Sequence, residues 1–204
     1  DMLGDHHHWR KPYAYEGSAN VPFILKWPKH HRGKLPSGSV LDQPVELRDI
    51  LPTFLDAAGS EVPEKMDGES LLSLVKNPQS PWRMWIDLEH SETYIGENYW
   101  SALTDGRMKY IWFFKTGEEQ LFNLLDDPHE LTNLAGKEEY SEELILWRKR
   151  LGEHLSERGD EFAKDGIPVI RENSVTYSPN YPDIEKTDGE RLRYWINELT
   201  KSYK

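Results

Sequence analysis

A two-residue turn, Asp105-Gly106, constrains the fold more than any other feature of the sequence, because it separates two runs that are rich in aromatic residues. A short turn of this composition between such runs is a strong signal for a β-hairpin. A second turn, "KTGEE", predicts that a further strand follows the hairpin. The runs expected to form strands are 85–89, 99–104, 108–114 and 120–123.

A helix is expected from Ser141 to Arg158, because apolar residues recur there at helical spacing. Ser141 is the expected N-cap, and two glutamates follow it in the first turn, where the helix dipole favours negative charge. The residues expected on the buried face are Leu144, Trp147, Leu151 and Leu155.

The first third of the chain has the pattern of the end of an α/β layer. The nearly continuous apolar run 21–27 predicts a buried strand, and the turn-rich stretch 29–44 predicts a loop. The stretch "ELRDILPTFLDAAG" predicts a helix with Pro52 in or near its first turn and Gly59 as its C-cap. A last amphipathic stretch at 189–199 predicts a short helix in the tail.

The composition excludes several classes of function. The chain has 25 Lys and Arg against 36 Asp and Glu, a net charge of −11, which disfavours nonspecific binding to nucleic acid or to anionic lipid. Its longest apolar runs, such as 21–25 and 111–114, are too short to span a bilayer. Because the chain has no cysteine, it can use neither disulfides nor thiol catalysis.

Familiar catalytic motifs are absent from the sequence. His6, His7 and His8 are adjacent, so in neither a strand nor a helix do all three readily reach one ion, and no HExxH pattern is present. No nucleophile elbow, P-loop or dinucleotide fingerprint occurs. Spacing therefore predicts no metal site in this chain.

Two cations form the strongest chemical feature. Arg10 and Lys11 lie between aromatic residues, just ahead of Glu16-Gly17 and the apolar run 21–27. Cations in that position suit an anionic group that enters at the edge of a sheet. Spacing alone leaves open the alternative that both are ordinary surface charges.

Six motifs occur in an order that is specific to one family: "DMLGDHHHWRK", "YEGSANVPFILKWP", "RDILPTFLDAAG", "DGESLL", "ALTDGRMKYIWF" and "LFNLLDDPHELTNLA". Together they span about residues 1–136. The chain thereby resembles the type I, formylglycine-dependent sulfatases of the alkaline phosphatase-like superfamily, and the match is close to the bacterial arylsulfatase group.

The resemblance implies that the chain is the C-terminal portion of such a sulfatase. Its fold would be α/β overall and α+β in this portion. Residues 1–81 would complete the large α/β domain, residues 82–166 would form a small antiparallel sheet of about four strands packed by a helix, and residues 167–204 would be a tail. The formylglycine nucleophile and the metal ligands would lie upstream, so calcium and formylglycine would belong to the full-length enzyme. This portion would bind no cofactor and be inactive alone.

The resemblance also implies partners and site residues. Lys11 stands five residues before Glu16, as does the family lysine that contacts the sulfate, and a point charge there would stabilise the leaving oxygen. Glu16 and Gly17 would be structural. The partners would be the N-terminal part of the protein and a sulfated small molecule or glycan, in a periplasmic or extracellular location. The candidate substrate contacts are Arg10, His7, His8 and His90, with packed or solvated histidines as the alternative.

Two other functions remain open at this stage. A phosphate or phosphonate ester hydrolase of the same superfamily would share these motifs. A free-standing carbohydrate-binding module would expose tryptophan and tyrosine on one sheet face. The sulfatase interpretation predicts instead that Trp85, Trp112 and Phe114 are largely buried and that residues 1–28 lack sheet partners.

Overall fold

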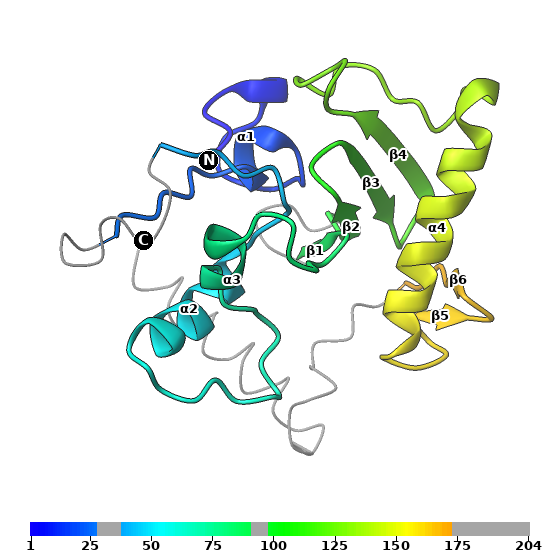
Figure 1. Ribbon diagram of the computed structural model, residues 1–204. Helices are drawn as coiled ribbons and strands as arrows, with labels where there is room; N and C mark the ends of the chain where they lie inside the picture. Colours follow the sequence, from blue (N-terminus) through cyan, green and yellow to red (C-terminus); the bar gives the residue numbers. More distant parts are fainter. Residues whose placement is uncertain (28–37, 91–97, 173–204) are drawn as a thin grey trace, which may run out of the picture.

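The computed structural model describes residues 1–27, 38–90 and 98–172 of the chain (Figure 1). Its centre is an antiparallel sheet of four strands in the order β1-β2-β3-β4, with each strand next to its neighbour in sequence. All four strands lie close to their predicted positions, which confirms the small antiparallel sheet. The strands are β1 (Ile86–His90), β2 (Trp100–Thr104), β3 (Met108–Phe113) and β4 (Glu118–Asn123).

The Asp105-Gly106 turn sets the register of the sheet. Asp105 Oδ1 accepts hydrogen bonds from the backbone N–H groups of Arg107 and Met108, at 2.9 and 2.7 Å, and Gly106 takes the left-handed φ of 84° that the turn requires. Thr104 consequently pairs with Lys109 across the hairpin. The predicted hairpin is confirmed.

One face of the sheet is covered by α4 (Ser141–Ser156), as Figure 1 shows. All four residues predicted for its apolar stripe are buried, and Trp147 is 0% exposed. The prediction that Ser141 caps the helix is wrong. A 3-10 turn, η4 (Glu138–Tyr140), runs directly into the helix, so Ser141 is its first helical residue and its hydroxyl donates to the Glu138 carbonyl at 2.5 Å.

A short hairpin that the sequence did not predict closes the end of α4. It consists of β5 (Ala163–Lys164) and β6 (Ile167–Pro168). A Cβ on Gly152 of α4 would lie only 1.9 Å from the Gly166 carbonyl oxygen, so glycine is what lets the helix and the hairpin approach. The tail helix predicted at 189–199 lies outside the described residues.

The opposite face of the sheet is covered by the start of the chain. The apolar cluster there contains Ala14, Trp100, Ile111 and Phe122, and Tyr13 and Tyr15 pack against it. Two short helices flank this contact, η1 (Asp5–His7) and α1 (Glu16–Ala19).

The large aromatic residues of the sheet are directed into its core. Trp112 and Phe114 are buried, and Trp85 is half-buried and packs at the edge of the same core. The expectation from the sulfatase interpretation is met, whereas the exposed aromatic sheet face that a carbohydrate-binding module would need is not found among the described strands.

The helical part of the first third is confirmed. A 3-10 turn, η3 (Leu47–Asp49), leads into α2 (Ile50–Ala57), which places Pro52 in the first turn, and α3 (Leu72–Lys76) follows. Gly59 has a φ of 70° and ends α2: its N–H donates to Asp56 O, and the next N–H donates to Leu55 O.

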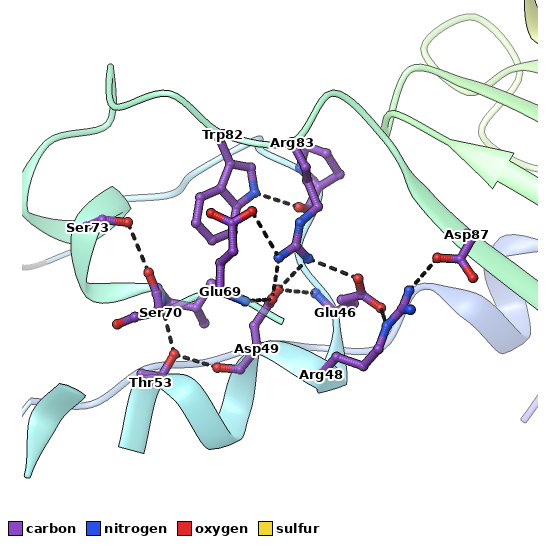
Figure 2. A network of polar contacts seen from close by, with 12 residues as sticks. Glu46, Arg48, Asp49, Thr53, Glu69, Ser70, Ser73, Trp82, Arg83 and Asp87 are labelled. Carbon is purple, nitrogen blue, oxygen red and sulfur yellow. Dashed lines mark hydrogen bonds and ion pairs between the residues drawn. The ribbon is translucent and has the colours of Figure 1, made fainter. Parts of the chain in front are cut away.

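A buried aspartate joins this helical part to the sheet (Figure 2). Asp49 is fully buried, and its two oxygens accept two hydrogen bonds from the Arg83 guanidinium, at 2.6 and 2.9 Å, and one each from the backbone N–H groups of Glu46 and Glu69. Arg83 lies just ahead of β1, so this network fixes α2 relative to the sheet.

The buried strand predicted over 21–27 is wrong. Among the described residues no strand pairs with this run, and Val21, Phe23, Ile24 and Leu25 are exposed, Ile24 by 87%. An apolar run becomes a buried strand only when a neighbouring strand satisfies its backbone. The expectation that 1–28 lacks sheet partners therefore holds for residues 1–27.

No helix in the described part of the chain combines the length and the apolar character needed to cross a membrane.

Candidate functional site

The loop formed by residues 1–11 has an unusual backbone. It closes on itself through hydrogen bonds from Met2 N–H to Arg10 O, at 2.6 Å, and from Gly4 N–H to His8 O, at 2.8 Å. Four of the six non-glycine residues with positive φ in the described part of the chain lie in this loop, and they are Leu3, His6, His7 and Arg10. Such conformations cluster at functional sites, where the surrounding structure holds them in place.

Lys11 is displayed from an anchored backbone. Its side chain is 64% exposed, and its ammonium lies 4.0 Å from Asp1 Oδ1. The next residue, Pro12, is buried, and its carbonyl accepts hydrogen bonds from the Trp100 indole, at 2.9 Å, and from the Asn98 amide. A fixed main chain with an accessible cation suits the capture of an anionic group.

His90 contacts the same two residues, Asn98 and Trp100, that hold the Pro12 carbonyl. It lies at the end of β1, stacks on the Trp100 ring with centroids 5.7 Å apart, and donates from Nδ1 to the Asn98 carbonyl at 2.9 Å. Because the carbonyl can only accept, Nδ1 carries the proton. The structure thus brings His90 and the Lys11 backbone to the same pair of residues, Asn98 and Trp100, which the sequence did not single out.

The other sequence-predicted contacts lie on the loop itself. His7 and Arg10 are exposed, while His8 is half-buried with its ring 4.6 Å from that of Tyr13. His6, which was not a candidate, has a structural position: its Nε2 donates to the His129 carbonyl at 2.8 Å, and its ring stacks on Tyr15. The contacts of His7, His8, Arg10 and His90 with a substrate stay predictions.

Glu16 and Gly17 are structural, as predicted. Glu16 Oε1 lies 2.7 Å from the ammonium of Lys109, which is 2.8 Å from Glu130 Oε1 on its other side. Burial raises the pKa of Glu130, although Lys109 opposes that shift. A Cβ on Gly17 would lie 2.7 Å from an oxygen of Asp5. The lysine inside the apolar run "MKYIWFF" was the available signal for this buried pair.

Within the described residues, one cluster brings together three side chains that could bind a metal, and they are Asp87, Glu89 and His154. Arg48 and Arg158 already form ion pairs with its two carboxylates. Burial alone would raise the pKa of Asp87, but His154 and Arg48 hold it well below its usual range. Calcium needs six to eight oxygen ligands, so this cluster fits an ion-pair network between β1 and α4 and not a calcium site.

Comparison with known proteins identifies the class to which this fold belongs. The family model described as "N-sulphoglucosamine sulphohydrolase, C-terminal" matches residues 4–157. An arylsulfatase from Clostridium perfringens is 42% identical over 172 residues, which make up 84% of this chain and 34% of that protein. An N-acetylglucosamine-6-O-sulfatase from Bacteroides thetaiotaomicron is 29% identical over 193 residues, which make up 91% of this chain and 30% of that protein.

Two solved structures share the fold. One is a protein in complex with its substrate D-glucosamine-2-N,6-O-disulfate, with a TM-score of 0.68, 27% identity, and coverage of 78% of this chain and 32% of that one. The other is a phosphonate monoester hydrolase from Silicibacter pomeroyi, with a TM-score of 0.62, 27% identity, and coverage of 77% of this chain and 33% of that one.

The chain belongs to the N-sulphoglucosamine sulphohydrolase C-terminal family. It corresponds to the C-terminal part of a sulfatase of the alkaline phosphatase-like superfamily, as the order of its motifs predicted. It spans about a third of the length of the sulfatases that it matches.

Proposed function

We propose that the whole protein is a sulfuric ester hydrolase and that this chain supplies Lys11 to its active site. The observation that carries the proposal is the exposed ammonium of Lys11. Lys11 follows a loop in which four non-glycine residues have positive φ, and the carbonyl of the next residue, Pro12, is held by a hydrogen bond from Trp100. Its place in a motif set shared with an arylsulfatase at 42% identity supports sulfate esters as the substrate class.

The chemistry of Lys11 follows from its charge. When a sulfate ester is hydrolysed, negative charge grows on the leaving alcohol oxygen, and a positioned ammonium stabilises that charge in the transition state. We propose that formylglycine and calcium, the nucleophile and the metal of the family, are held by the part of the protein outside these 204 residues. The residues of this chain bind and orient the anionic group.

Among the candidate substrate contacts, His90 has the strongest support. It shares Asn98 and Trp100 with the Lys11 anchor, whereas His8 packs on its own neighbour Tyr13. We therefore rank His90 first, Arg10 and His7 next because they are exposed on the loop, and His8 last.

A sulfated glycan is the favoured substrate. An N-acetylglucosamine-6-O-sulfatase is among the relatives, and a structural neighbour was solved with D-glucosamine-2-N,6-O-disulfate. The phosphonate monoester hydrolase neighbour keeps phosphonate esters as the second candidate, because both ester classes present an anionic tetrahedral group to Lys11.

The remaining part of the sulfatase is the proposed partner of the exposed apolar surface. Leu47, Leu51 and Phe54 on and beside α2 are exposed together with the run 21–25. Apolar surface of this kind marks a contact site, and a neighbouring strand from the larger α/β domain would also satisfy the backbone of 21–27.

The test is turnover by the full-length protein in the presence of calcium, with an aryl sulfate, a sulfated glucosamine and a phosphonate monoester as substrates. Lys11→Ala should lower kcat about a hundred- to a thousandfold. Lys149→Ala is the matched control, because Lys149 is 68% exposed on α4 and forms a comparable long ion pair with Glu153. Full activity of the Lys11 variant, or turnover by the 204-residue chain alone, would overturn the proposal.

A further inference from the structure

A fully buried lysine joins the Lys11 loop to the sheet. Lys109 on β3 is 0% exposed, and its ammonium lies between Glu16 Oε1 and Glu130 Oε1. A buried ammonium is tolerated only where carboxylates or carbonyls accept its hydrogen bonds. Here both acceptors come from other segments, so the lysine connects the start of the chain with the turn that follows β4.

The backbone that carries Lys11 is held at three points by residues of that sheet and turn. On the near side, His6 donates to the His129 carbonyl at 2.8 Å. In the middle, the Pro12 carbonyl accepts from the Trp100 indole at 2.9 Å. On the far side, Glu16 is held by Lys109. Lys11 lies between the first and the last of these anchors.

Glu130 holds Glu16 in two ways, by a direct hydrogen bond and through Lys109. Its Oε2 accepts the backbone N–H of Glu16 at 2.6 Å while its Oε1 accepts from Lys109. Its backbone has a φ of 54°, and the carbonyl of the preceding residue, His129, holds His6. The pair His129 and Glu130 thus contacts the backbone on both sides of Lys11, and Lys109 is the cation that fixes Glu130.

We propose that Lys109 is a positioning residue for ester hydrolysis: it touches no substrate but fixes, through Glu16 and Glu130, the backbone that carries Lys11. The inference rests on the proposed function. Misplacing a catalytic group by about an ångström costs on the order of a hundredfold in rate. A purely structural lysine would instead lower stability without a selective loss of turnover.

The experiment compares Lys109→Met and Glu130→Gln with Glu119→Gln. The Glu119 carboxylate bonds to Arg148 and Tyr110, both outside residues 1–20, so it is a matched control for the loss of a carboxylate network. Two quantities are measured: kcat and KM of the full-length protein, and amide hydrogen exchange of Glu16, Gly4 and Met2 in the 204-residue chain. Unchanged protection in α4 verifies that each variant is folded.

In Lys109→Met, kcat should fall about a hundredfold with a smaller change in KM. Exchange at the Glu16 amide should accelerate about ten- to a hundredfold, the equivalent of one charge-assisted hydrogen bond. Glu130→Gln should also lower kcat and accelerate exchange at the Glu16 amide, but by less, because the glutamine side chain keeps one acceptor oxygen. Glu119→Gln should leave kcat and these amides near the parent values.

Unchanged exchange at residues 2–16 in Lys109→Met would overturn the positioning role, and so would faster exchange with an unchanged kcat. An equal loss of kcat in Glu119→Gln would show that Lys109 is merely structural. If the parent protein hydrolyses none of the three esters, the proposed function fails and the positioning role fails with it. The exchange data would still decide separately whether Lys109 holds the loop.

Discussion

Residues 86–90 and 98–172, here named the sheet region, pack α4 and four strands around a continuous apolar core. Residues 1–27 and 38–85, here named the leading region, contact the sheet region partly through ion pairs, from Glu16 to the buried Lys109 and from Arg48 to Asp87. The leading region also exposes apolar side chains, among them Ile24 and Phe54. The comparison teaches that one region carries its own core, whereas the other is oriented by directional polar contacts together with the apolar contact of Tyr13, Ala14 and Tyr15 with the sheet.

Directional contacts suit the task assigned to the leading region. The hydrophobic effect is non-directional, whereas a buried ion pair is favourable only where its geometry is good. After Lys11, the Pro12 carbonyl accepts a hydrogen bond from Trp100 and Glu16 pairs with Lys109, so the backbone that carries Lys11 is fixed. We propose that the exposed apolar surface of this region contacts the remaining part of the sulfatase.

The largest effect is expected in the sheet region, where Trp147→Ala removes a fully buried side chain. The free energy of unfolding should fall by about 3–5 kcal/mol, because the core cannot close over the space left. Urea denaturation measures it. Ile145→Ala, at an exposed position on the same helix, should change stability by less than about 1 kcal/mol, and similar losses in both variants would contradict the assigned core.

Arg83→Met tests the polar network that holds the start of α2 against the segment leading into β1. It leaves the buried carboxylate of Asp49 without its cation, which should cost about 3 kcal/mol. Hydrogen exchange should accelerate in α2 far more than in α4, because Asp49, directly ahead of α2, is the residue that Arg83 holds. Equal acceleration in both helices would mean that the two regions unfold as one unit, which would break the comparison.

A pH series on Glu119→Gln probes an ion pair inside the sheet region. Burial alone would raise the pKa of Glu119, but hydrogen bonds from Arg148 and Tyr110 outweigh it and hold the pKa below the ordinary value of 4.5. The stabilisation is therefore complete above pH 4.5 and is lost as the pH falls through the lowered value.

At neutral pH, Glu119→Gln should cost about 2 kcal/mol, and the difference from the parent should shrink in acid. Thermal unfolding at several pH values measures it. Glu139→Gln, at an exposed position, is the control, and a constant difference down to acid pH would show that Glu119 does not titrate as the structure requires.

The smallest effect on stability is expected at the exposed surface of the leading region. Phe54→Gln on α2 should change the free energy of unfolding of the 204-residue chain by less than about 0.5 kcal/mol, because Phe54 is 67% exposed. The same change should reduce self-association, measured by light scattering. A large loss of stability would mean that Phe54 already packs within this chain.

Local signals in the sequence predicted the sheet region well. The Asp105-Gly106 turn predicts the hairpin between β2 and β3 from local residues alone, and the spacing of apolar residues in α4 predicts which face of that helix is buried. The run 21–27 was misassigned, because its apolar pattern does not reveal whether a neighbouring strand is present in the same chain. Ser141 was misassigned because a 3-10 turn extends the helix ahead of it.

The candidate site could be predicted only in part. The motif spacing pointed to Lys11, and the family resemblance named His90 among four candidate contacts, but the residues that anchor them are remote in sequence. Asn98 and Trp100 reach Pro12 across more than eighty positions, and Lys109 reaches Glu16 across 93. Pairings at that separation depend on the tertiary fold, and no local pattern specifies them.

The central claim, that Lys11 acts on the leaving oxygen of a sulfate ester, is tested most directly by varying the leaving group. The measurement is kcat/KM of the full-length parent and of Lys11→Ala over a series of aryl sulfates whose phenols differ in pKa. The account predicts that the loss in Lys11→Ala grows as the phenol pKa rises, because a poorer leaving group needs the ammonium more. An equal loss across the series, or no loss, would contradict it.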